Sequence, residues 1–266
     1  MAVDTFSLKV KGLKKQYNDS VVLNGVSAAF LDNSVNVIIG PSGIGKSVLL
    51  KCLLGLEQPD SGEVKFLKCL SNDTTPRIGI LFQKPVLYSE KTVYDNVKFN
   101  LDLYSREIKV EDPDKAIREA LQQVGLSEHA EEYPGNFSGG MQKRLGLAMA
   151  IVYKPQYLFC DEPDSGLDPE ATASINKLIY DLTHAKGMTT VIITHNLDTV
   201  LTSSDYVVFL DKIQAKSLEN KDEGAKVFWH GPVADLINVR KKRLQTFLDS
   251  NILWREYKKN HEVKND

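Results

Sequence analysis

One stretch constrains the fold of this chain more than any other. It is GPSGIGKS, and its residues are Gly40, Pro41, Ser42, Gly43, Ile44, Gly45, Lys46 and Ser47. The stretch fits the pattern G-x-x-x-x-G-K-[ST] in full, and it stands between a strand-like run (35–39) and an apolar helical run (48–54). Glycines let the backbone curl until several N–H groups point at one anion, and the following helix adds its positive end. The alternative is a turn that only leads into a buried helix.

The context favours a phosphate-binding loop over that alternative. We therefore expect a nucleoside triphosphate here, with Lys46 reaching the β- and γ-phosphates and the Ser47 hydroxyl binding Mg²⁺.

Short apolar runs elsewhere predict strands. Phe6, Leu8 and Val10 alternate with polar residues, as in a half-buried strand. Predominantly apolar runs indicate strands buried on both faces, as in a parallel sheet covered by helices; they occupy residues 35–39, 77–82, 157–160, 189–194 and 206–210.

Helix signals stand between these runs. Asp168-Pro169 and Asp112-Pro113 each offer an N-cap and a first-turn proline, and apolar residues then recur at helical spacing. Residues 84–150 carry mostly helical signals and no clear strand, so we expect a helical insert in an α/β core.

Composition narrows the class of protein. The chain has 266 residues, a net charge of −2 and three cysteines without metal-ligand spacing. This charge favours neither nucleic acid nor an anionic surface, and the cysteines suggest a reducing compartment. The N-terminus does not resemble a signal peptide, and no apolar run approaches the ~18 residues of a spanning helix. We expect a cytoplasmic location.

A second set of residues has the character needed for hydrolysis. Asp161 and Glu162 end an apolar strand, where the first can help to hold Mg²⁺ and the second can polarise a water. The glycine-rich element Ser138-Gly139-Gly140 leads into a helix and can form a second anion cradle. Gln83 and His195 follow strands, the usual place for site residues in open α/β sheets. Each of these features alone has an ordinary structural reading.

The order of these pieces resembles the nucleotide-binding domain of ABC transporters over about residues 6–250. The resemblance implies an α/β P-loop NTPase core with a mostly parallel sheet, an N-terminal antiparallel β subdomain and a helical subdomain at about 84–150. Residues 1–250 would form one ATPase domain, and 251–266 a charged tail. The motifs carried over are Walker A (40–47), the Q-loop glutamine (Gln83), the signature (138–140), Walker B with its catalytic glutamate (161–162), the D-loop (165–168) and the switch histidine (His195).

The resemblance also implies a function and partners. Two copies would pair head to tail around two ATP molecules with Mg²⁺ held by Ser47, Gln83 and Asp161, and Ser138, Gly139 and Gly140 would come from the second copy. Tyr17 sits where the family stacks an aromatic ring on adenine. Hydrolysis would energise permease subunits, with the chain peripheral on the cytoplasmic face of the inner membrane and no nucleic-acid partner.

A finer resemblance is to the ATPases of Mla-type phospholipid transporters. It rests on SGIGKSVLLKCLLGL, ILFQKPVLYSEKTVYDNVKFNL, FSGGMQKR and the late LQTFL. It implies an MCE-domain lipid-binding protein and a small regulatory subunit as further partners. The chain departs from that pattern at Asn100, at Asp164 and in the long polar segment 212–227.

Other readings stay open at this point. The chain could serve another importer or exporter, for amino acids or drugs, or be a soluble ABC protein acting on ribosomes or DNA. A regulator that does not hydrolyse ATP would be expected to lack Glu162 or His195. In the tail, the spaced apolar residues of 244–254 can either pack on a partner or fold back on the chain's own core.

Overall fold

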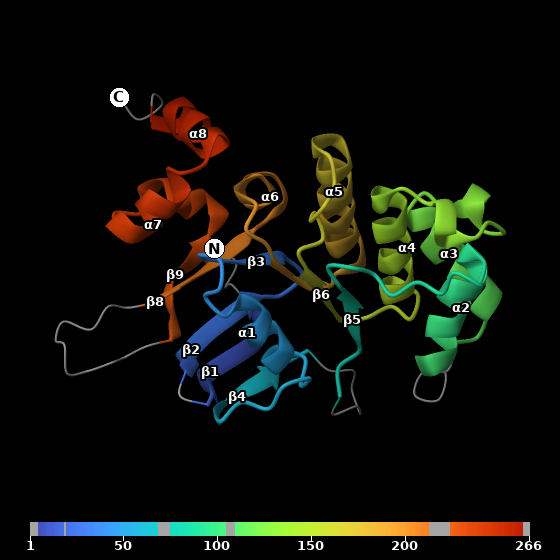
Figure 1. Cartoon of the computed structure of the whole chain (residues 1–266), viewed down its shortest axis with the longest axis horizontal. Helices are drawn as coiled ribbons and strands as arrows, with labels where there is room; N and C mark the ends of the chain where they lie inside the picture. The colour runs from blue at the N-terminus through green and yellow to red at the C-terminus, as the bar shows by residue number, and fades with distance from the viewer. Residues whose placement is uncertain (1–4, 19, 69–74, 105–109, 213–223, 263–266) are drawn as a thin grey trace. The chain divides into compact units, whose positions relative to one another are not determined.

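The computed structural model describes residues 5–18, 20–68, 75–104, 110–212 and 224–262. They group into two units, one made of Met1–Lys68 with Val191–Asp266 and the other of Cys69–Thr190. The chain returns from the second unit to the first within strand β7 (Thr189–Ile193), in which all five residues are buried. Each unit is described by itself, and Figure 1 labels their elements.

The first unit begins with antiparallel strands. Strand β1 (Phe6–Tyr17) buries Leu8 and Val10, as the alternation predicts, and it pairs antiparallel with β2 (Ser20–Leu31) and with β4 (Ser61–Phe66). These strands lie together in blue and cyan in Figure 1. The expected antiparallel β subdomain is therefore confirmed.

The strand that leads to the phosphate loop lies in the interior. Strand β3 (Val35–Ile39) is buried throughout and pairs in parallel with β8 (Tyr206–Lys212), with Val37 opposite Val207. Strand β9 (Ala225–Pro232) pairs antiparallel with β8 and in parallel with β2, which gives the order β4-β1-β2-β9-β8-β3 in this unit. Most of the long polar segment 212–227, residues 213–223, lies outside the described residues.

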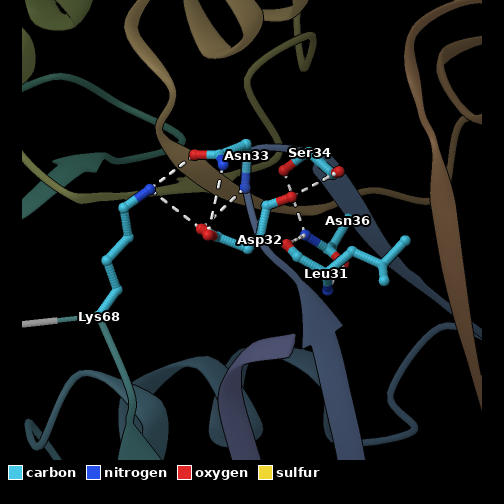
Figure 2. Close-up of polar contacts among 6 residues, drawn as sticks. All are labelled: Leu31, Asp32, Asn33, Ser34, Asn36 and Lys68. Carbon is cyan, nitrogen blue, oxygen red and sulfur yellow. Dashed lines mark hydrogen bonds and ion pairs between the residues drawn. The ribbon is translucent and has the colours of Figure 1, made fainter. Parts of the chain in front are cut away.

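A polar turn fixes the entry into β3 (Figure 2). Lys68 Nζ lies 3.0 Å from Asp32 Oδ1 and 2.6 Å from Asn33 Oδ1, and Asn33 has a φ of 51°. The side-chain amide of the buried Asn36 donates to the carbonyls of Leu31 (3.0 Å) and Ser34 (3.1 Å). Because these bonds satisfy the backbone of the turn, the chain enters β3 in one fixed direction.

The C-terminal tail folds onto the first unit. Leu244, Leu248 and Trp254 are buried, and Asn251 Nδ2 donates to Asp198 Oδ1 at 3.2 Å. The fold-back alternative is therefore confirmed for these residues, while Ile252 is 69% exposed. The helical elements of this unit are α1 (Lys46–Leu53), α6 (Leu197–Ser203), η3 (Val233–Asn238), α7 (Lys242–Leu248) and α8 (Ile252–Glu262).

The second unit combines two strands with most of the helices. Strand β5 (Ile78–Leu81) pairs in parallel with β6 (Tyr157–Asp161). The described part of 84–150 contains helices and no strand, as predicted, and α2, α3 and α4 pack on one another (Figure 1). The helical elements of the second unit are α2 (Val93–Tyr104), α3 (Pro113–Gln123), η1 (Ser127–His129), η2 (Pro134–Asn136), α4 (Gly139–Ile151) and α5 (Pro169–Lys186).

The predicted helix caps are confirmed. Asp112 Oδ1 accepts from the Lys115 N–H at 3.0 Å at the start of α3, and Asp168 Oδ1 accepts from the Ala171 N–H at 2.8 Å at the start of α5. Gly125 follows the end of α3 with a φ of 71°. No helix in the described ranges combines the length and the apolar character needed to cross a bilayer.

Candidate functional site: a phosphate loop and an acidic strand end

The loop between β3 and α1 has a backbone that requires its glycines. Gly43 and Gly45 have φ values of 71° and 110°, which side chains rarely tolerate. A Cβ on Gly45 would lie 2.8 Å from Val22 Cγ1, and one on Gly40 would strike the Leu210 carbonyl oxygen. Strand β2, which carries Val22, and strand β8, which carries Leu210, therefore lie close against the loop and leave no room for side chains at Gly45 and Gly40.

Lys46 is folded into this loop. Its side chain is buried, and Nζ donates to the carbonyls of Gly40 (2.9 Å) and Pro41 (3.1 Å). Helix α1 begins at Lys46 without a side-chain cap, so the N–H groups of its first turn are not satisfied in that way. Ser47 is exposed next to it. A loop with a central cation and uncapped N–H groups suits an anion with several oxygens.

Tyr17 and His195 belong to the same unit as the loop. Tyr17 ends β1 with 40% of its surface exposed, and Lys15 Nζ lies 5.1 Å from the centre of its ring. Lys15 Nζ also lies 2.8 Å from Glu57 Oε1, which raises the lysine pKa. His195 is exposed directly after β7. Both side chains are thus accessible to a ligand.

In the second unit, the predicted acidic pair ends strand β6. Tyr157 to Cys160 are fully buried, whereas Asp161 and Glu162 are half-buried. Glu162 has a φ of 45°, a left-handed conformation that is uncommon for a residue with a side chain. Its carbonyl accepts from the Ser165 N–H at 3.1 Å. No feature of the sequence indicates this conformation.

Two predicted site residues meet in this unit. Gln83, which follows β5, donates from Nε2 to Glu162 Oε2 at 2.9 Å and to Ser165 Oγ at 3.0 Å. Gln83 is exposed, so this contact lies at the surface of the unit. The Glu162 carboxylate, which would position a water, is therefore itself held by the side-chain amide of Gln83.

Sequence reasoning missed Lys143, which lies beneath this pair. Its side chain is only 4% exposed, and Nζ donates to the carbonyls of Gln83 (2.6 Å) and Glu162 (3.2 Å). Burial lowers the pKa of Lys143, and the Asp164 carboxylate is the strongest of the groups that raise it. The available signal was helical spacing, because Lys143 shares one face of α4 with the buried Leu147 and Ala150.

The signature residues begin helix α4. Ser138 is its N-cap, and Oγ accepts from the Met141 N–H at 3.3 Å. A cavity of about 270 Å³ lies between this helix start and the first turns of α5, lined by Ser138, Gly140, Met141, Arg144, Asp168, Glu170, Ala171, Ser174 and Ile175. A Cβ on Gly140 would make an ordinary van der Waals contact with Ala171 Cβ at 3.6 Å, so Gly140 lies against the first turn of α5.

Two departures from the Mla-type pattern have structural partners. Asn100 Nδ2 donates to the Met149 carbonyl at 2.5 Å, which ties α2 to α4. Asp164 is 7% exposed and interacts electrostatically with Lys143. Both substitutions are thus accommodated inside the second unit.

Comparison with known proteins adds the family context. A family model described as ABC transporter matches residues 23–165. The "Probable ribonucleotide transport ATP-binding protein mkl" of Mycobacterium leprae is 39% identical over 207 residues, which are 75% of this chain and 59% of that protein. The chain thus spans less than two thirds of that relative. The methionine import ATP-binding protein MetN of Clostridium tetani is 35% identical over 254 residues, 92% of this chain and 76% of that protein.

Solved structures show the same fold. The structure of cbiO1 from Clostridium perfringens, part of the ABC transporter complex cbiONQ, is 28% identical with a TM-score of 0.73, and covers 93% of this chain and 100% of that one. An ATP-binding cassette of an ABC transporter in its ADP conformation has a TM-score of 0.74 at 24% identity, over 93% of this chain and 100% of that one. The expected α/β P-loop fold is confirmed.

Proposed function

The chain belongs to the ABC transporter family, and from this premise we propose that it binds and hydrolyses ATP to energise a membrane transporter. The observation that carries the proposal is the glycine-rich loop folded around Lys46. The two relatives named above are both called ATP-binding proteins, which supports the ligand. The contact between Gln83 and Glu162 supports hydrolysis rather than binding alone, since it orients a carboxylate that could polarise water.

Each predicted site residue has a role in this proposal. The N–H groups of residues 40–47 and the Lys46 ammonium bind the β- and γ-phosphates, and Tyr17 stacks on the adenine. Glu162 polarises the attacking water, and Gln83 and His195 orient it and the γ-phosphate. In-line attack needs positioning and charge neutralisation and no covalent intermediate.

Mg²⁺ is the proposed cofactor. Ser47, Gln83 and Asp161 offer a hydroxyl, an amide and a carboxylate oxygen, the donors that this hard cation prefers. The described residues contain no cluster of three or more His, Cys, Asp or Glu side chains that could hold a metal alone. The donors of Ser47, Gln83 and Asp161 fit Mg²⁺, because this ion is usually held by few protein oxygens together with phosphate oxygens and water. The ion would neutralise charge on the phosphates.

Substitution of Lys46 tests the ATP site directly. Lys46→Ala should lose most of its MgATP affinity in titration calorimetry, because the only side-chain cation of the loop is removed. Lys51→Ala is the matched control, since Lys51 is an exposed lysine of the same helix. Equal affinity of Lys46→Ala and Lys51→Ala for MgATP would contradict the assignment of the loop.

The active form in this proposal is a head-to-tail homodimer. Ser138, Gly139 and Gly140 of one copy would complete the site of the other, so the cavity at the start of α4 would receive the partner's nucleotide. Mixing of two inactive variants, Lys46→Ala and Ser138→Arg, should restore activity, because one of the two sites in a mixed dimer combines two intact halves. Full hydrolysis by Ser138→Arg alone would refute the shared site.

The proposed cargo is phospholipid, moved with permease subunits, an MCE-domain protein and a small regulatory subunit at the cytoplasmic face of the inner membrane. The support is the sequence similarity at 80–101 and 137–144. The names of the two relatives give other cargoes, ribonucleotide and methionine, and methionine import is the second candidate. Affinity purification from mild-detergent extracts of the native cells tests this. Recovery of an MCE-domain protein supports phospholipid, whereas a permease without one contradicts it.

A further inference from the structure

Lys143 is a buried cation whose partners are main-chain oxygens of two predicted site residues. An ammonium that is 4% exposed carries a large desolvation cost unless it is hydrogen-bonded and compensated by charge. Its hydrogen bonds go to the carbonyls of Gln83 and Glu162. The carboxylates of Asp164, Asp161 and Glu162 supply the compensating charge.

This cation joins segments that are distant in the sequence. Lys143 is 60 residues from Gln83 and 19 residues from Glu162. The side chains of those two residues meet at 2.9 Å, so one ammonium holds both backbones at the point where their side chains touch. The contacts form a closed ring within the second unit. The Lys143 ammonium donates to the Gln83 carbonyl, the Gln83 side-chain amide donates to the Glu162 carboxylate, and the Glu162 carbonyl accepts from the same ammonium.

The backbone at Glu162 needs such support. A left-handed conformation outside glycine is strained and persists where neighbouring groups impose it. The Glu162 carbonyl accepts from Lys143 and from the Ser165 N–H, and these two bonds fix the direction of the peptide. Removal of the ammonium would take away the charged hydrogen bond that Lys143 donates to the Glu162 carbonyl.

We propose that Lys143 is a positioning residue for ATP hydrolysis: its ammonium holds the main-chain carbonyls of Gln83 and Glu162 so that the amide and the carboxylate face each other. It acts through those two residues and does not touch the nucleotide. The inference rests on the proposed ATPase function and adds to it a lysine outside the predicted site residues.

The test compares Lys143→Met with Lys177→Met in the full-length protein. The first keeps a side chain of similar length without the ammonium, and the second removes an exposed lysine of the same unit that pairs with Asp181. For Lys143→Met we expect kcat to fall roughly 10- to 100-fold, as for a displaced reacting group, with KM for ATP within about twofold of wild type. Lys177→Met should keep wild-type kinetics. A wild-type kcat for Lys143→Met would overturn the proposal.

Hydrogen exchange separates positioning from a general loss of structure. In Lys143→Met the hydrogen-bonded amides of Ser165 and Leu167 should exchange roughly tenfold faster or more, since a charged hydrogen bond to their turn is lost, while α3 keeps its protection. Equal acceleration in α3 would overturn the proposal, because Lys143 would then only stabilise the unit. If Lys143→Met does not fold, Lys143→Gln, which lacks the charge, is judged by the same criteria.

A double-mutant cycle completes the test. In a Gln83→Ala background, Lys143→Met should cost less in kcat than in wild type, because one of the two side chains it positions is gone. Equal costs in both backgrounds would overturn the proposal. Absence of ATP hydrolysis in the wild-type protein would refute the proposed function instead, and the exchange experiment would still decide whether Lys143 holds the turn.

Discussion

Gly45→Ala is the most informative perturbation of the phosphate loop, because its cost can be divided into two parts. The first is conformational: an alanine at a φ of 110° is strained by on the order of 1–3 kcal/mol. The second is steric, since the new Cβ would lie 2.8 Å from Val22 Cγ1, and overpacking of this kind costs about 1–3 kcal/mol. We expect a total loss of about 3 kcal/mol in the free energy of unfolding.

Gly43→Ala supplies the matched control. Gly43 has a φ of 71°, and nothing lies within 4 Å of a Cβ built on it, so only the conformational part remains, about 1–2 kcal/mol. For a chain of this size each kcal/mol lowers Tm by roughly 2–4 °C, so the two variants should be separable by calorimetry.

Val22→Ala then tests the steric part. It removes Val22 Cγ1, the shortest contact, and leaves Leu23 Cδ2 at 3.2 Å, so Gly45→Ala introduced into Val22→Ala should cost less than Gly45→Ala does in the wild type. MgATP affinity should fall with Gly45→Ala as well, because the N–H groups of the loop are reoriented. A Tm for Gly45→Ala equal to that of Gly43→Ala would refute the claim that β2 crowds the loop.

Two further predictions concern the rest of the chain. Trp254→Ala should lower the free energy of unfolding, measured by urea titration, by about 3–5 kcal/mol, because the ring is 2% exposed and Nε1 donates to Asp249 Oδ1. A loss below about 1 kcal/mol would contradict the fold-back of the tail. The Cys160 thiol is fully buried, which raises its pKa well above the usual range. With the other two cysteines replaced (Cys52→Ser, Cys69→Ser), maleimide should not label native protein at pH 8 and should label it in urea; rapid native labelling would contradict this burial.

The sequence predicts the elements whose signals are local. Apart from Asn36 in β3 and the terminal Asp161 of β6, these two strands are apolar runs because both of their faces are buried. The Asp-Pro pairs mark the starts of α3 and α5 because the cap lies within three residues of its donor. The phosphate loop is equally readable, since the special φ values fall on glycines of its pattern.

Strand β2 shows why other elements were not predicted. It contains Asn24-Gly25, which is typical of a turn, and Gly25 has a φ of 76° inside the strand. The strand continues because β1 shifts its register opposite this point, and β9 pairs on the other side. Both pairings are decided by segments that are distant in the chain, so a local pattern could not reveal them.

The features of the candidate site fall into the same two groups, those with a local sequence signal and those that depend on distant segments. Gln83 and Glu162 could be chosen by type and position at strand ends, and the structure brings their side chains into contact. The left-handed backbone at Glu162 and the ammonium of Lys143 beneath it could not, because they depend on hydrogen bonds across 19 and 60 residues. The choice between a tail that packs on a partner and one that folds back on the chain's own core also required the burial of Leu244 and Trp254.

The central claim is that this chain hydrolyses ATP with Glu162 as the group that polarises water. The most direct measurement is the turnover of MgATP by purified wild type and Glu162→Gln, with MgATP affinity measured on the same samples. We expect the wild type to hydrolyse MgATP, and Glu162→Gln to bind MgATP with comparable affinity and to hydrolyse it at least about a hundredfold more slowly. Wild-type turnover by Glu162→Gln, or no turnover by either protein, would contradict the central claim.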